Sequence, residues 1–78
     1  MKKVTIYSRT GCHLCDIAVD KVKSVNNEIN FDLEVRLIDN SQDLEKEYGE
    51  QVPVILIDNK IHDYWRVDLD RFITALKS

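Results

Sequence analysis

The sequence is poor in proline and glycine and has no long hydrophobic run. Its 78 residues include one proline and two glycines, and no linker, repeat or low-complexity segment is visible. No apolar stretch reaches the roughly 18 residues that a transmembrane helix needs, and residues 1–7 lack the apolar run of a signal peptide. We therefore expect a cytoplasmic protein that neither crosses nor binds a membrane.

Long runs of basic residues are also missing. The net charge is −3, and Lys2, Lys3, Lys21 and Lys23 are scattered among acidic residues, which argues against nucleic acid as a partner. A chain of 78 residues has the size of a single domain, here residues 1–78, and leaves no room for a separate cofactor-binding domain. We expect a monomer of ordinary globular composition.

Cysteine is scarce too, because the only two cysteines, Cys12 and Cys15, form a single C-x-x-C motif. A stable structural disulfide is unusual in the reducing cytoplasm. In that setting a lone C-x-x-C indicates redox chemistry or metal binding rather than a structural crosslink.

Hydrophobic periodicity predicts the first half of the fold. Residues 3–8 alternate as in a strand. A helix is expected from Cys12 to about Asn27, with an apolar stripe made of Leu14, Ala18, Val22 and Val25, widened by Ile17. Residues 31–37 alternate again, which predicts a strand whose buried face carries Phe31, Leu33, Val35 and Leu37.

The second half continues the alternation. The expected elements are a short helix at residues 41–48, an apolar strand at 52–57, a return strand at 60–64 and a final helix at 69–76. Asn40 or Ser41 would cap the short helix, Gly49 would end it, and Asp68 would cap the last. The order β-α-β-α-β-β-α predicts an α/β fold with a four-stranded mixed sheet and helices on both faces. Its first two strands should be parallel and its last two should form an antiparallel hairpin.

The two cysteines lie where the first strand gives way to the helix. The unpaired N–H groups and the dipole of a helix N-terminus favour an anion, so we expect Cys12 to ionise more readily than a free thiol, whose pKa is about 8.5. Cys15 lies one turn further along the same face, at a spacing that suits a disulfide. Cys12 is therefore the predicted nucleophile and Cys15 the resolving thiol.

Neighbouring residues are expected to tune this pair. Gly11 permits a tight turn just before the nucleophile. Arg9 can place a positive charge beside it, and His13 adds a second when protonated, whereas the carboxylate of Asp16 disfavours another anion. Because these charges oppose one another, the sequence predicts no net direction for their combined effect on the pKa of Cys12.

Other interpretations stay open at this point. A zinc site needs four ligands and only His13 and His62 accompany the cysteines, so we expect no metal within one chain. A zinc ion or an iron–sulfur cluster shared between two chains is the remaining metal alternative. A c-type haem needs a histidine where Asp16 stands. Tyr64 and Trp65 either contact substrate or pack the last helix onto the sheet, and His62 is expected at the surface.

Two motifs and the element order of the whole chain carry a family resemblance. The motifs are YSRTGCHLC at residues 7–15 and QVPV at residues 51–54. They resemble those of glutaredoxin-like proteins in the thioredoxin-fold superfamily, especially a compact bacterial subgroup with a C-H-L-C motif. The resemblance implies a cis-proline at Pro53 that faces the disulfide, a Val52 backbone that pairs with an extended thiol substrate, and an Arg9 that meets the carboxylate of glutathione.

Two departures from the glutaredoxin pattern concern glutathione. Gln51 stands where these proteins usually have a threonine. Residues 64–67, Tyr-Trp-Arg-Val, occupy the place of a Gly-Gly turn, although Asp68 matches the acid that follows it. Bulky side chains at that turn would keep the glutathione backbone away, so we expect weak use of glutathione.

We predict a thiol–disulfide oxidoreductase that reduces a disulfide-containing protein or a small thiol substrate through Cys12 and Cys15. It would need no bound cofactor, and glutathione is a candidate co-substrate. One alternative is a dedicated electron donor to a single enzyme, itself reduced by thioredoxin reductase. Another is a non-enzymatic module that binds a metal or a peptide.

Overall fold

The computed structural model describes residues 2–77 and confirms the predicted order of helices and strands. The elements are β1 (Lys3–Ser8), α1 (His13–Asn26), β2 (Asp32–Leu37), the 3-10 turn η1 (Ile38–Asn40), α2 (Gln42–Tyr48), β3 (Val54–Ile57), β4 (Lys60–Tyr64) and α3 (Leu69–Lys77). The turn η1 is the one addition to the prediction. Among the described residues, no helix is long and apolar enough to cross a membrane.

The four strands form one mixed sheet in the order β2-β1-β3-β4. β1 pairs in parallel with β2 through the α1 crossover and antiparallel with β3, and β3 pairs antiparallel with β4. Asp58 and Asn59 join the last two strands, both with positive φ (51° and 69°), as a tight hairpin turn that follows strand twist requires. The Lys3 N–H donates to the Asp58 carboxylate at 2.9 Å and ties this turn to β1.

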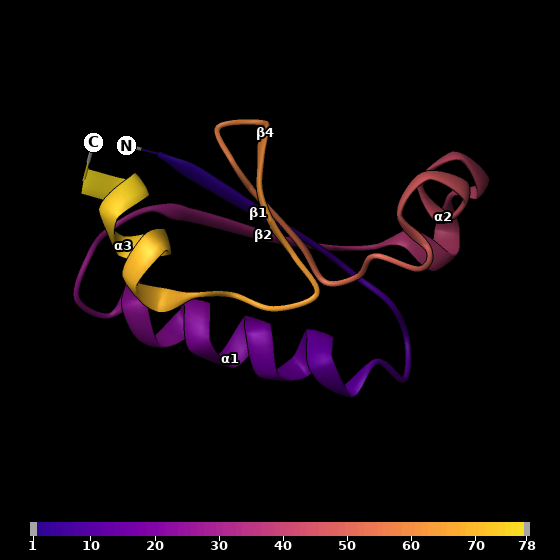
Figure 1. Ribbon diagram of the computed structural model, residues 1–78, viewed down its shortest axis with the longest axis horizontal. Coiled ribbons are helices and arrows are strands. Elements are labelled where there is room, and N and C mark those ends of the chain that lie inside the picture. Colours follow the sequence, from indigo (N-terminus) through magenta and orange to yellow (C-terminus); the bar gives the residue numbers. More distant parts are fainter. Residues whose placement is uncertain (1, 78) are drawn as a thin grey trace.

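The core lies between the sheet and the pair α1 and α3, which cover the same face (Figure 1). Because strand side chains alternate, Val4 and Ile6 of β1 point to this face, and both are fully buried. Phe72 of α3 is fully buried at the centre and meets Phe31 edge to face, with 5.8 Å between ring centroids. The other buried members of this cluster are Ala18, Val22, Val25, Ile55, Ile57, Val67 and Leu76.

The short helix α2 meets the other face of the sheet. Tyr7 alternates with Ile6 and therefore points away from α1, and its ring stacks on Tyr48 of α2 with centroids 5.0 Å apart. The hydroxyl of Ser41 caps the helix by accepting from the Leu44 N–H at 3.3 Å. The prediction of helices on both faces of the sheet is thus confirmed. Ser41, one of the two residues expected to cap this helix, is its N-cap.

The predicted burial of β2 is wrong in its second half. Phe31, which precedes the strand, is buried and Leu33 is half-buried, but Val35 and Leu37 are 42% and 46% exposed. The reason is that β2 is an edge strand, and the apolar faces of α1 and α3 pack over β1 and β3 instead. An alternating pattern predicts which face of the sheet a side chain lies on, but not whether a helix covers that part of the face.

Candidate active site

The two cysteines are joined in a disulfide at the start of α1. Their Cα atoms are 5.2 Å apart. Cys12 is the N-cap of the helix, and its Sγ accepts a hydrogen bond from the Cys15 N–H at 3.2 Å. Cys15 is fully buried and Cys12 is only half-buried. The sulfur nearer solvent is therefore the one that also lies at the positive end of the helix dipole.

A tight turn delivers Cys12 to this position. The N–H of Cys12 donates to the Arg9 carbonyl at 3.1 Å, and Gly11 has φ +77°, a conformation that side chains disfavour. His13 and Asp16 lie in the first turn of α1, both exposed. Within residues 2–77 neither of their side chains makes a hydrogen bond or an ion pair, so their tuning of Cys12 stays a prediction.

The guanidinium of Arg9 contacts α2 and η1. It donates to the Gly49 carbonyl at 3.1 Å and lies 3.4 Å from a Glu45 carboxylate oxygen and 3.9 Å from one of Asp39. Asp39 also accepts from the Thr10 N–H at 3.0 Å. Hydrogen bonds from Thr10 and then the charge of Arg9 hold the pKa of Asp39 below its usual value.

Arg9 is therefore a clamp that fixes the loop before Cys12. Sequence reasoning missed this role, because its partners Glu45 and Gly49 lie 36 and 40 residues away. The roles expected for Arg9, holding a thiolate and a substrate carboxylate, stay predictions. Glu45 and Asp39 already offset much of its charge.

Pro53 and Val52 lie where β3 begins. The bond between them is cis, as the resemblance implied, and Pro53 is fully buried. The Trp65 N–H donates to the Pro53 carbonyl at 2.8 Å, with a longer contact to the Gln51 carbonyl at 3.4 Å. The N–H and C=O of Val52 have no hydrogen-bond partner among the described residues. Its main chain can therefore pair with an extended substrate.

Trp65 borders the site, where its exposure favours the substrate-contact interpretation over packing of α3 onto the sheet. Its side chain is 57% exposed, and its backbone has φ +66°, where a non-glycine residue is strained. The indole N–H donates to the Glu50 carbonyl at 3.0 Å. The one polar group of the indole is thus satisfied, although the residue remains exposed.

Two hollows meet at Trp65. We call the larger one, of about 460 Å³, the α2 hollow; it is lined by Glu45, Lys46, Glu47, Glu50, Gln51 and Trp65. The smaller, of about 30 Å³, is the α1 hollow; it is lined by Leu14, Ile17, Ala18, Lys21, Trp65, Arg66 and Val67. Leu14 and Ile17 were expected in the buried stripe of α1 but are 54% and 39% exposed. They line the α1 hollow, whereas Cys15 and Ala18 on the same turns are buried.

Residues 3–77 match the family model of the glutaredoxin-like domain (DUF836). The chain belongs to the glutaredoxin-like family. An uncharacterized protein of Mycobacterium tuberculosis is 30% identical over 74 residues, which cover 88% of this chain and 76% of that protein. The solution structure of a Nitrosomonas europaea protein is 29% identical with a TM-score of 0.82, covering 95% of this chain and 89% of the other.

The glutaredoxin of E. coli has the same fold. It superposes with a TM-score of 0.62 at 24% identity, over 96% of this chain and 93% of the glutaredoxin. The α/β thioredoxin fold predicted for this glutaredoxin-like protein is confirmed. A Cys12–Cys15 pair bonded at the start of the first helix supports thiol chemistry of the redox type.

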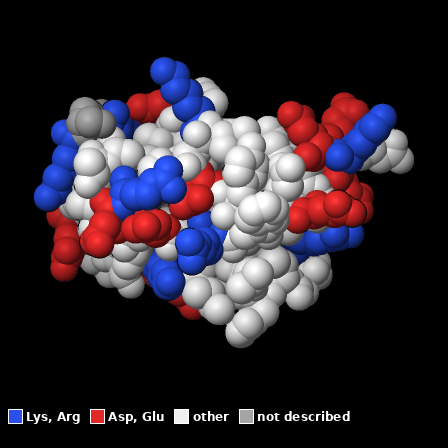
Figure 2. Space-filling view, viewed as in Figure 1, with Lys and Arg blue, Asp and Glu red and all other residues white. Residues whose placement is uncertain are grey.

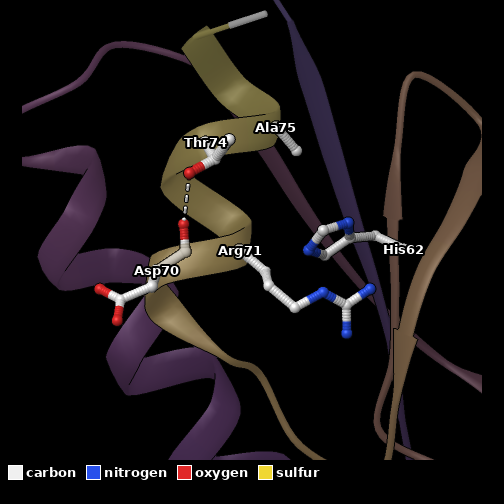
Figure 3. Close-up of a pocket in the computed structure, with 5 residues that line it drawn as sticks. All are labelled: His62, Asp70, Arg71, Thr74 and Ala75. Atoms are coloured by element: carbon white, nitrogen blue, oxygen red, sulfur yellow. Dashed lines mark hydrogen bonds between the residues drawn. The ribbon is translucent and has the colours of Figure 1, made fainter.

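Two further observations on this glutaredoxin-like chain concern metal binding and a hollow away from the cysteines. In the described part of the chain, no three His, Cys, Asp or Glu side chains converge as ligands of one metal ion. A separate hollow of about 380 Å³ lies between β4 and α3. There His62 and Arg71 point toward each other, while Asp70 and Thr74 point away (Figure 3).

The sequence led us to expect His62 at the surface, but the residue is half-buried. Its Nε2 is buried and has no hydrogen-bond partner among residues 2–77. Burial first, and then the charge of Arg71, lowers the pKa of His62 below 6.5.

Proposed function

We propose that this protein is a thiol–disulfide oxidoreductase that reduces substrate disulfides by dithiol exchange. The observation that carries the proposal is the bonded pair itself, with Cys12 half-buried at a helix N-terminus and Cys15 fully buried one turn behind it. A structural crosslink would not need one sulfur near solvent at the positive end of a helix.

The reaction starts from the reduced pair. The Cys12 thiolate attacks one sulfur of the substrate disulfide, a Cys12–substrate bond forms, and the other substrate sulfur leaves as a thiolate that takes up a proton. Cys15, as its thiolate, then attacks the Cys12 sulfur and releases the second substrate thiol. Two electrons pass to the substrate and the Cys12–Cys15 disulfide remains. An external thiol or dithiol must reduce it again.

The residues around the pair have distinct parts in this scheme. The Cys15 N–H, which donates to the Cys12 sulfur at 3.2 Å, stabilises a negative charge there when Cys12 ionises. The unpaired main chain of Val52 binds an extended substrate beside the pair. Arg9 keeps the intervening loop in place through its contacts with α2.

The proposal is tested by trapping the mixed disulfide. Reduced Cys15→Ser protein should accumulate a covalent complex with a disulfide-bridged peptide, seen by mass spectrometry and released by dithiothreitol, because the resolving thiol is missing. Cys12→Ser protein, the matched control, should form none. A complex of equal yield through Cys15 in the Cys12→Ser protein would overturn the assignment, and failure of the unmodified protein to reduce the peptide would overturn the function.

The electron source is a second part of the proposal. We propose a cytoplasmic protein that uses glutathione poorly, because Trp65 projects an exposed ring at the turn where glutaredoxins carry small residues. Turnover with glutathione and its reductase should be slower than with thioredoxin reductase as the electron source. The opposite ranking would identify glutathione as the reductant.

A further inference from the structure

We propose that the α2 hollow binds a lysine or arginine side chain of a protein substrate, so that the cysteine pair selects disulfides in basic segments. The proposal rests on the proposed function and names its substrate class. Ligand pockets in proteins span roughly 300–1,000 Å³. At about 460 Å³, the hollow has room for one long side chain with part of its backbone.

The charge of the lining favours a cation. The residues that line the hollow include three glutamates, Glu45, Glu47 and Glu50, and one basic residue, Lys46. Glu45 is paired with Arg9, but within the described residues Glu47 and Glu50 form no ion pair. Figure 2 shows several acidic side chains at the end of the molecule where α2 lies, with basic side chains among them. An anionic ligand would be repelled from this hollow.

Trp65 supplies a second and independent attraction for a cation. Its indole is fixed by the hydrogen bond to the Glu50 carbonyl at 3.0 Å and remains 57% exposed. Tryptophan is the side chain whose ring face attracts an ammonium or guanidinium group most strongly. A long basic side chain can lay its apolar stem along the ring and bring its charged end to the carboxylates.

The hollow adjoins the path of the substrate on two sides. Gln51 lines it and directly precedes Val52, whose main chain is unpaired in the described part of the chain. Glu45 lines it and contacts Arg9, three residues before Cys12. Residues of an extended strand that are two apart share a face and lie about 6.6 Å from each other. The basic residue therefore lies within a few positions of the substrate cysteine.

Two peptide disulfides test this selectivity. Each is a symmetric disulfide-linked dimer of a short peptide with one cysteine. Two positions from the cysteine, one peptide has lysine and the other has glutamate, and all other side chains are uncharged. The measurement is the second-order rate at which pre-reduced protein reduces each peptide, divided by the rate with dithiothreitol to remove intrinsic reactivity. The lysine peptide should react at least about fivefold faster at low ionic strength, and the ratio should shrink at high salt.

Variants of the hollow then locate the preference. Glu47→Gln and Glu50→Gln should each slow the lysine peptide by roughly two- to fivefold and leave the glutamate peptide no slower. Trp65→Gly, which suits the positive φ, should slow the lysine peptide by a similar factor. Glu28→Gln, the control, makes the same charge change beyond the other end of α1 and should change the ratio less than the hollow variants do.

Each outcome has one meaning. Equal normalised rates for the two peptides, or a preference for glutamate, would overturn the inference while leaving the proposed function intact. A lysine preference that Glu28→Gln reduces as much as Glu47→Gln would also overturn it, because net charge and not the hollow would then be responsible. Failure to reduce either peptide would instead remove the proposed function.

Discussion

Replacing Phe72 by alanine should remove a large part of the stability of this domain. Phe72 is fully buried at the centre of the core and packs edge to face on Phe31. A buried Phe→Ala change costs about 3–5 kcal/mol, whereas a domain of 78 residues has about 4–12 kcal/mol in total. The melting temperature should fall by at least about 12 °C, since each kcal/mol is worth roughly 4–8 °C at this size.

Urea unfolding followed by far-ultraviolet circular dichroism measures this loss. Thr74→Ala is the matched control, because Thr74 lies on the same helix but is exposed, and it should change the free energy of unfolding by no more than about 0.5 kcal/mol. Phe72→Leu should fall between the two. A loss below about 1 kcal/mol in Phe72→Ala would mean that α3 is not docked on the sheet as described, and the placement of residues 65–67 beside the site would fail with it.

Three smaller predictions concern pH, the loop and a cap. Because the pKa of His62 is lowered on folding, stability should be full above about pH 6.5 and fall as the pH drops from there toward the folded pKa; His62→Gln should flatten that slope in urea midpoints. Asp39→Asn should speed amide exchange at Thr10, measured by NMR, because a charged acceptor is lost; unchanged exchange would refute the anchoring role. Ser41→Ala should cost about 1 kcal/mol of stability by removing the α2 cap, while the same change at Ser24, which is exposed on α1, should cost much less.

Local features of the sequence were enough for the order of elements and for the cysteine pair. The period of the apolar residues changes at Cys12, and a helix start is where the chain brings residues 12 and 15 onto one face. The turn at Asp58 and Asn59 was predictable for the same reason, since both residues tolerate positive φ. Each of these predictions depends on neighbours within a few positions.

What the sequence could not show depends on distant partners. The exposure of Val35 and Leu37 follows from the edge position of β2, which is set by the pairing of β1 with β3. The contact of Arg9 with Glu45 spans 36 residues, and no local pattern marks it. Such outcomes are decided by tertiary packing and not by periodicity.

Several departures from ordinary folding rules gather around Trp65. Leu14 and Ile17 are exposed apolar residues on the first turns of α1, Trp65 holds a strained backbone with an exposed ring, and Val52 leaves its main chain unpaired in the described structure. A protein selected only for stability would bury Leu14 and Ile17. It would also have glycine in place of Trp65 and a hydrogen-bonded main chain at Val52. Proteins tolerate such features mainly at functional sites. Because Leu14, Ile17 and Trp65 line hollows that share Trp65, the surface beside the cysteines has an apolar wall on the α1 side and a glutamate-rich wall on the α2 side, which is the arrangement that the proposed docking of a basic substrate segment requires.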